Sequence, residues 1–202
     1  MKDVIEIGKK YIGIKDHSEL VDYYNANCIS LVKPNRRYKM KYSDDWCAMF
    51  VSVLAHKSGL SRKDFPYEVS VYYQWQRANE MNITAHDPQL LRVGDLVVYS
   101  WTNRTTRFNH VGMIADIEND SLHVLEGNYK KTVGIRKISK SSLSIHGVIL
   151  SSRPLHDVTH NDRINTLVNK TIRGDFGNGA ERRVALGDDY EEVQGIINNM
   201  DW

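Results

Sequence analysis

The feature that most constrains the fold is a change in the spacing of apolar residues near residue 90. Before it, apolar positions recur at helical intervals, which predicts helices over 3–12, 18–27, from Asp44 or Asp45 to Gly59, and around 71–80. After it they alternate, which predicts strands over 91–99, 110–116, 121–126, 132–138 and 145–150. Helices followed by an antiparallel sheet are typical of an α+β fold.

The C-terminal part of the chain has a different character. The stretch RPLHDVTHND contains a proline and little periodicity, so it is interpreted as a linker. We therefore expect one domain over 1–153, a linker over 154–160 and a small all-α module over 161–202. In that module, two helices at 162–170 and 190–200 are expected to flank the glycine-rich segment RGDFGNGAERR.

Composition excludes several classes of protein. The chain is 41% hydrophobic and 26% charged, as in globular proteins, and its apolar runs are too short to cross a bilayer. A net charge of +2 favours neither a nucleic-acid partner nor a membrane anchor. Lys2, Asp3 and Glu6 interrupt the start of the chain, so no secretory signal is expected, and work outside the cell would require another route of release.

Cys47 is the candidate nucleophile. Cys47, Phe50, Val51 and Leu54 recur at helical spacing, which predicts the thiol on the core-facing side of a helix, in its first turn. The positive end of the helix dipole favours a thiolate there. The alternative is a small buried apolar residue, which is the better interpretation for Cys28, in YNANCISL, where no base lies nearby in sequence.

His110 is the candidate base. The ENDS turn predicts a hairpin in which His110 lies opposite either Glu126 or Asn128; both registers bring the three side chains to one face. Gly112 would leave room on that face. His123 has the opposite parity to Glu126 and is expected to point away.

The segments YSDDWCAMFVS, LRVGDLVVYSW, NHVGMIADI and LHVLEGNY, in this order, resemble the CHAP (cysteine, histidine-dependent amidohydrolase/peptidase) domains of phage endolysins and bacterial wall hydrolases. The resemblance covers roughly 1–153 and implies a papain-like fold. It also implies that Cys47 is the nucleophile, His110 the base, Glu126 the group that orients the imidazole and Asn128 a further polar residue of the site. KYSDDW lacks the alternating aspartates of the calcium-binding members, so no metal or other cofactor is expected.

The tail TIRGDFGNGAERRVALGDDYEEVQGIIN is similar to the CW-seven type of cell-wall-binding repeat. The resemblance implies that Gly177, Asn178, Gly179 and Arg182 lie near a wall ligand. Related proteins often carry tandem copies, whereas this chain has one, which indicates avidity through homo-oligomerisation.

Together these features predict a peptidoglycan hydrolase of the endolysin type. It would be made in the host cytoplasm, released with the help of a holin, and would act on bacterial peptidoglycan without nucleic-acid or membrane partners. It would cut as an endopeptidase or an N-acetylmuramoyl-L-alanine amidase, since both use the same catalytic residues. Two alternatives remain: a non-catalytic wall-binding or assembly protein, and a thiol protease or transamidase acting on proteins.

Overall fold

The computed structural model describes residues 4–86, 91–101, 108–151 and 160–200. The N-terminal half is helical, as expected. Its α-helices are α1 (Val4–Lys9), α2 (Ser18–Tyr23), α3 (Cys47–Ser58) and α4 (Val71–Glu80). Helix α2 continues as a π-helical turn over Tyr24–Cys28, and 3₁₀ turns follow at Ile29–Leu31 and Pro34–Arg36.

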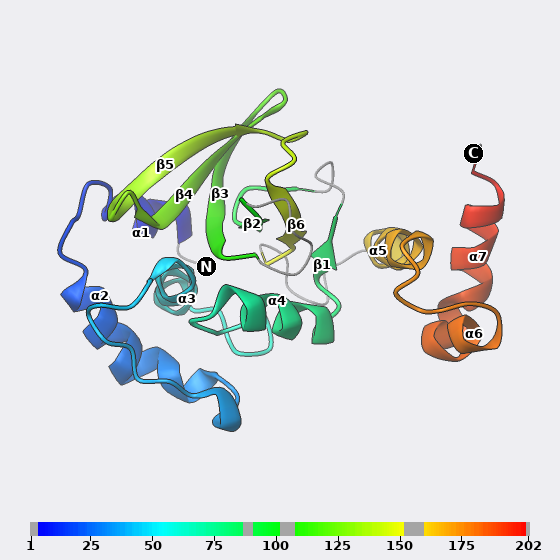
Figure 1. The fold of residues 1–202 in the computed structure, drawn as a ribbon, viewed down its shortest axis with the longest axis horizontal. Coiled ribbons are helices and arrows are strands. Elements are labelled where there is room, and N and C mark those ends of the chain that lie inside the picture. Colours follow the sequence, from blue (N-terminus) through cyan, green and yellow to red (C-terminus); the bar gives the residue numbers. More distant parts are fainter. Residues whose placement is uncertain (1–3, 87–90, 102–107, 152–159, 201–202) are drawn as a thin grey trace.

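The second half forms an antiparallel sheet, in agreement with the α+β expectation (Figure 1). Its strands are β1 (Thr84–Ala85), β2 (Leu96–Tyr99), β3 (His110–Glu118), β4 (Ser121–Tyr129), β5 (Thr132–Ser139) and β6 (Ile145–Ile149). Their spatial order is β1-β6-β2-β3-β4-β5. Sequence did not predict β1, because two residues carry no periodicity and this strand exists only through its pairing with β6.

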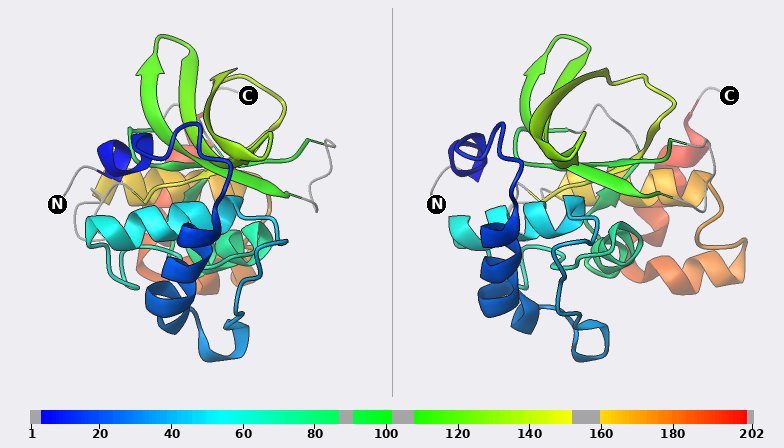
Figure 2. Two further views of the ribbon diagram at one scale, coloured as in Figure 1. Left: turned by 90° about the vertical axis from the view of Figure 1, so that its left-hand side faces the viewer. Right: turned by 60° about the vertical axis from the view of Figure 1, so that its left-hand side comes forward.

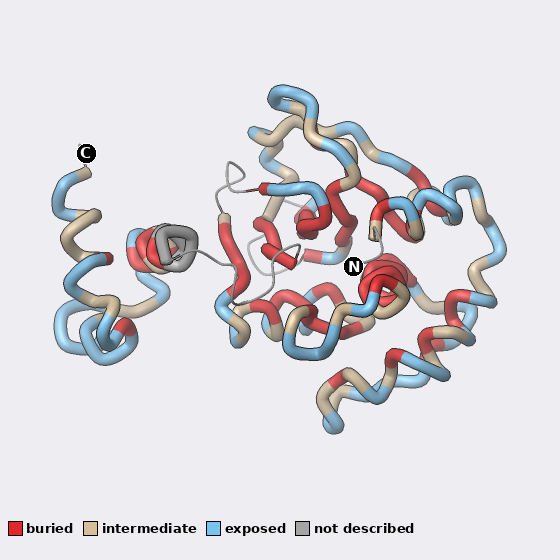
Figure 3. The backbone as a smooth tube through the Cα atoms, turned by 180° about the vertical axis from the view of Figure 1, so that it is seen from behind, coloured by how far each residue is buried: buried red, intermediate tan, exposed pale blue. Residues whose placement is uncertain are grey.

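Helix α3 packs against β3 and β4 of the sheet and also contacts α1, α2 and α4, while α1 itself lies beside the sheet (Figures 1 and 2). The sequence predicted that one apolar side of α3 is buried. The helix is buried more extensively than that, since residues outside this side, such as Ala48 and Val53, are also fully enclosed. The buried segments in Figure 3 are concentrated where α3 meets β3 and β4. A helix buried on most sides holds its first residue in a fixed place.

The ends of α3 test two expectations. Gly59 ends the helix in the left-handed conformation (φ +92°), as predicted. The prediction that Asp44 or Asp45 caps the helix is wrong. Trp46 is the N-cap residue, and its side chain forms no capping hydrogen bond. Asp44 instead accepts a hydrogen bond from the backbone N–H of Lys41, and Asp45 accepts one from the side chain of Asn128. Neither carboxylate caps the helix.

Beyond the sheet, three helices form the C-terminal module: α5 (His160–Ile172), α6 (Ala180–Leu186) and α7 (Tyr190–Asn198). Helix α6 was not expected, because its first four residues belong to the glycine-rich segment. A separate apolar cluster holds these helices together, formed by Ile164, Val168, Leu186 and Val193. The predicted linker over 154–160 lies outside the described residues, except for His160, where α5 begins.

No helix in the described ranges is long and apolar enough to cross a membrane.

Candidate active site

The thiol of Cys47 lies at the junction of helix and sheet. Cys47 is the first residue of α3 and its side chain is buried. The first N–H groups of a helix have no intrahelical carbonyl partner, and their dipoles favour negative charge. Cys47 thus lies in the first turn of the helix, as the sequence predicted.

His110 contacts both neighbours expected of a catalytic imidazole. Its Nε2 lies 2.9 Å from Oε2 of Glu126, and the Cys47 thiol lies near enough to the ring to raise the pKa of His110. Because an ionised carboxylate only accepts, Nε2 carries the hydrogen that faces Glu126, which leaves Nδ1 for the sulfur. Burial lowers the pKa of His110, but the contacts with Cys47 and Glu126 outweigh it and raise this pKa to about 9.

Glu126 is fully buried and bound from two sides. Arg136 donates from Nε to Oε1 (2.7 Å) and from Nη2 to Oε2 (3.0 Å), so Oε2 is shared between Arg136 and His110. Burial raises the pKa of Glu126, and the hydrogen bonds from His110 and Arg136 more than reverse this, leaving the pKa below its usual value. The site therefore holds a charged carboxylate behind the imidazole.

Sequence reasoning did not identify Arg136. The β4–β5 register pairs Glu126 with Gly134, so Arg136 lies diagonally across on the same face. Its guanidinium also lies over the rings of Trp101 (4.6 Å) and Tyr129 (4.8 Å). A basic residue at the diagonal position of the second hairpin was the signal that could have identified it.

Next to the turn, Glu118 pairs with Ser121, a register that the sequence did not predict. Beyond a bulge between Ile114 and Asp116, Met113 pairs with Leu125, and this is the predicted register that sets His110 opposite Asn128 when it is continued. Gly112 is required on that face: a Cβ there would lie 2.6 Å from Cγ of Glu126. The glycine thus lets the glutamate side chain cross the strand.

Asn128 has a contact that the sequence did not indicate. It adopts a left-handed backbone (φ +58°) at an irregularity of β4, and its Nδ2 donates to Oδ1 of Asp45 at 2.8 Å. This bond ties the sheet to the segment just before Cys47. Asn128 thus lies at the edge of the site, beside the chain segment that precedes Cys47.

The residues set aside on sequence grounds lie elsewhere. Cys28 is buried, and burial raises the pKa of its thiol to about 12, which keeps it protonated and unreactive. His123 approaches Glu118 (3.5 Å) near the far end of the hairpin.

In the C-terminal module, Arg182 holds the glycine-rich loop. It donates to the carbonyl of Gly177 from Nε (3.2 Å) and Nη2 (3.1 Å), to Asn178 (3.1 Å) and to Gln194 of α7 (3.0 Å). Gly177 and Gly179 both have positive φ, which favours glycine at these two positions. Of the four residues expected near a wall ligand, Gly177, Asn178 and Gly179 therefore form one loop, and Arg182, from α6, maintains its shape.

Helices first, an antiparallel sheet second, and a cysteine at their junction place the fold in the papain-like α+β class. Comparison with family models narrows this class. The CHAP domain model matches residues 22–128, more than half of the chain, and the chain belongs to the CHAP domain family. The CW_7 repeat model matches residues 165–200.

CHAP domains act on peptidoglycan as amidases or peptidases, and the CW_7 repeat indicates binding to the cell wall. Neither a curated protein nor a solved structure matches the chain. Within the described residues there is no group of three or more histidine, cysteine, aspartate or glutamate side chains placed to hold a metal ion.

Proposed function

We propose that the chain is a peptidoglycan hydrolase of the endolysin type that cleaves an amide bond through a thiol mechanism. Cys47 is the nucleophile and His110 the general acid and base. The observation that carries this proposal is the position of the His110 imidazole, which contacts the Cys47 thiol on one side and the buried Glu126 carboxylate on the other.

The chemistry follows from this geometry. Transfer of the thiol proton to Nδ1 of His110 gives a thiolate and an imidazolium, whose charge Glu126 stabilises. The thiolate attacks the amide carbonyl carbon, and the C–N bond breaks as His110 gives its proton to the departing amine. His110 then takes a proton from water, which attacks the thioester and releases the carboxylic acid and the thiol. The backbone N–H of Cys47, at the start of α3, is suited to stabilise the oxyanion.

Glu126 and Asn128 support this chemistry without reacting. Glu126 fixes the imidazole in the tautomer that leaves Nδ1 free for sulfur. Asn128 holds Asp45 and so stabilises the chain immediately before the nucleophile. The bond that is cut is either the N-acetylmuramoyl-L-alanine amide or an amide within the stem peptide, because the walls of the substrate groove and not the catalytic pair select between them.

The test is hydrolysis of purified sacculi, with mass spectrometry of the released fragments. Cys47→Ala should lower the rate by at least about a thousandfold, because the nucleophile is gone. Cys28→Ala is the matched control: it removes a second buried sulfur atom and should leave the rate within about twofold, since that thiol is unreactive. Iodoacetamide should inactivate the parent protein and the Cys28 variant alike.

A Cys47→Ala protein that still clears walls at a tenth of the parent rate would refute the thiol mechanism. Fragments cut only between sugars would refute amide cleavage.

A further inference from the structure

A hollow of about 600 Å³ lies between the CHAP domain and the C-terminal module, and we call it the inter-module groove. Its walls come from both parts of the chain: α4 and the sheet on one side, and α5 with the loop that follows it on the other. Helix α5 contacts β1, and Figure 1 shows it beside that strand, with α6 and α7 further out.

Lys170 is the unusual residue of this groove. It lines the hollow from α5, only 7% of its surface is exposed, and its ammonium forms no hydrogen bond or ion pair with any described residue. The adjacent Asp175 is bound to Arg173 at 3.0 Å. Burial lowers the pKa of Lys170 by more than the charge of Asp175 raises it. Lysine is rarely buried unless it is paired, because desolvation of an ammonium is costly.

The opposite wall of the groove is aromatic. Phe108 stacks on His146 (centroids 4.2 Å apart) and Tyr72 stacks on Phe108 (5.6 Å). Trp75 meets His146 edge-on at 5.0 Å. Burial lowers the pKa of His146, which favours the uncharged form of this ring. A groove that combines aromatic rings with a buried lysine suits a ligand that has an anionic group on an organic body.

The groove adjoins the proposed catalytic centre. Phe108 precedes His110 by two residues, a span of at most about 7 Å. On the other side, Tyr72 and Gln76 also line a neighbouring hollow of about 340 Å³. That hollow shares Arg36 with a third one, which includes Asp45. The three hollows therefore adjoin one another in a row that runs from the segment before Cys47 to the C-terminal module.

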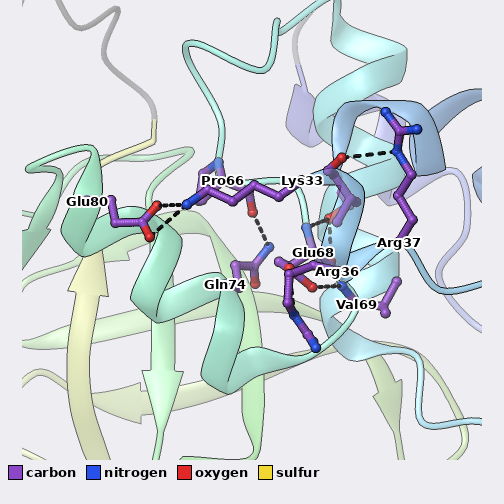
Figure 4. Close-up of polar contacts among 10 residues, drawn as sticks. Lys33, Arg36, Arg37, Pro66, Glu68, Val69, Gln74 and Glu80 are labelled. Atoms are coloured by element: carbon purple, nitrogen blue, oxygen red, sulfur yellow. Dashed lines mark hydrogen bonds and ion pairs between the residues drawn. The ribbon is translucent and has the colours of Figure 1, made fainter.

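The middle hollow differs from the groove because three of its four cations are paired with carboxylates, and the fourth, Arg62, is exposed to solvent. Figure 4 shows Lys33 bound to Glu80 (2.6 Å) and Arg36 beside Glu68 (3.5 Å). These ion pairs satisfy the charges without a ligand. Lys170, by contrast, is buried and has no ion pair with any residue that the structure describes.

We propose that the inter-module groove binds an oxyanion of the wall polymer, with Lys170 as its counter-charge and the aromatic wall against the body of the ligand. The proposal rests on the proposed function in that it takes the cell wall as the substrate. The oxyanion is a carboxylate of the stem peptide or a phosphate of a wall polymer. One wall strand would then contact both modules, so α5 would contribute directly to substrate binding.

The test measures binding by the fluorescence of Trp75 and its neighbours in the full chain carrying Cys47→Ala, which prevents cleavage. Three probes are compared: a muropeptide with free stem carboxylates, the same muropeptide with those carboxylates amidated, and inorganic phosphate. Lys170→Met should weaken binding of one anionic probe by about tenfold or more, since a charge-assisted hydrogen bond is lost. Lys10→Met is the matched control, because Lys10 is exposed to solvent near the N-terminus and lines none of these three hollows.

The pattern across probes identifies the source of the oxyanion. A loss for the free muropeptide, with weak binding of the amidated form by both proteins, supports a stem carboxylate. A loss for phosphate alone supports a phosphate. Equal binding of every probe by Lys170→Met and the parent overturns the proposal, and so does an equal loss for the free and the amidated muropeptide, which would mean a packing role.

Two measurements distinguish a binding role of Lys170 from a structural role and from an effect on Cys47. Methionine has a similar volume and no charge to bury, so the melting temperature of Lys170→Met should not fall. With Cys47 restored, its reaction with iodoacetamide should be unchanged by Lys170→Met. If Cys47→Ala proved active on walls, the thiol mechanism would fail while the binding comparison would keep its meaning.

Discussion

The carboxylate of Glu126 is completely buried, and three hydrogen bonds from His110 and Arg136 replace the water it has lost. Removal of one partner of such a group leaves an uncompensated buried charge, which costs more than the net value of the pair. The side chain that sequence reasoning missed is therefore as important to the site as those it identified.

Arg136→Met should lower stability by about 3 kcal/mol and kcat/KM by about tenfold or more, because Glu126 then orients His110 less firmly. The folded-state pKa of Glu126 is lowered, so its contribution to stability is present above its unfolded pKa and is lost as pH falls through the folded value. Loss of Arg136 should raise that pKa and move acid unfolding to higher pH. Urea titrations at several pH values measure this, and Arg136→Lys should recover only part of the loss. An acid transition unchanged in Arg136→Met would contradict this role.

The pH dependence of activity should depend on the raised pKa of His110. The imidazolium form of His110 is maintained up to about pH 9, where the alkaline limb of kcat/KM should fall. The matching contribution to stability is fully present below the unfolded pKa of about 6.5 and is lost as pH rises through about 9. Glu126→Gln removes one cause of the raised pKa, so the alkaline limb should move to lower pH. An alkaline limb in the same place for both proteins would argue against the pairing.

At the scale of elements, the sequence predicted the parts whose signal is local. The start of α3 near Cys47, its end at Gly59 and the hairpin of β3 and β4 follow from periodicity and turn residues. The parts it missed depend on distant partners: β1 needs β6, and the bond from Asn128 to Asp45 crosses 83 residues. A capping rule that considers only residues adjacent in sequence cannot predict that Asp45 accepts a hydrogen bond from Asn128.

Gly112 tests whether the hairpin geometry sets the site. Gly112→Ala would place a Cβ 2.6 Å from side-chain atoms of both Glu126 and Val124, so we expect a loss of about 1–3 kcal/mol in stability. The rate of wall hydrolysis should fall as well, because Glu126 must move. Gly195→Ala is the matched control: no other atom lies within 4 Å of the new methyl group, and alanine favours the helix α7. Comparable losses in the two variants would show that the close packing at Gly112 is not needed.

At the scale of the whole molecule, the two apolar clusters share no residue, and each has its own helices. The CHAP domain should therefore fold without the C-terminal module. The module in turn is too small to bury a large core, and the four hydrogen bonds of Arg182 are a large part of what fixes its loop. The modules thus differ in stability, and the smaller one is the more easily lost.

A chain that ends at residue 156 should retain the Cys47, His110 and Glu126 contacts and still cleave muropeptide fragments in solution. On whole sacculi it should be at least about tenfold weaker, because the tether that raises the local enzyme concentration at the wall is gone. The loss on fragments should be smaller, and limited to what Lys170 contributes in the inter-module groove. Pelleting with sacculi separates binding from catalysis: the full chain and its Cys47→Ala variant should pellet equally, and the shortened chain should stay in solution. If the shortened chain pellets as well as the full one, the C-terminal module is not the wall anchor, and its single copy is better explained by a role in oligomerisation.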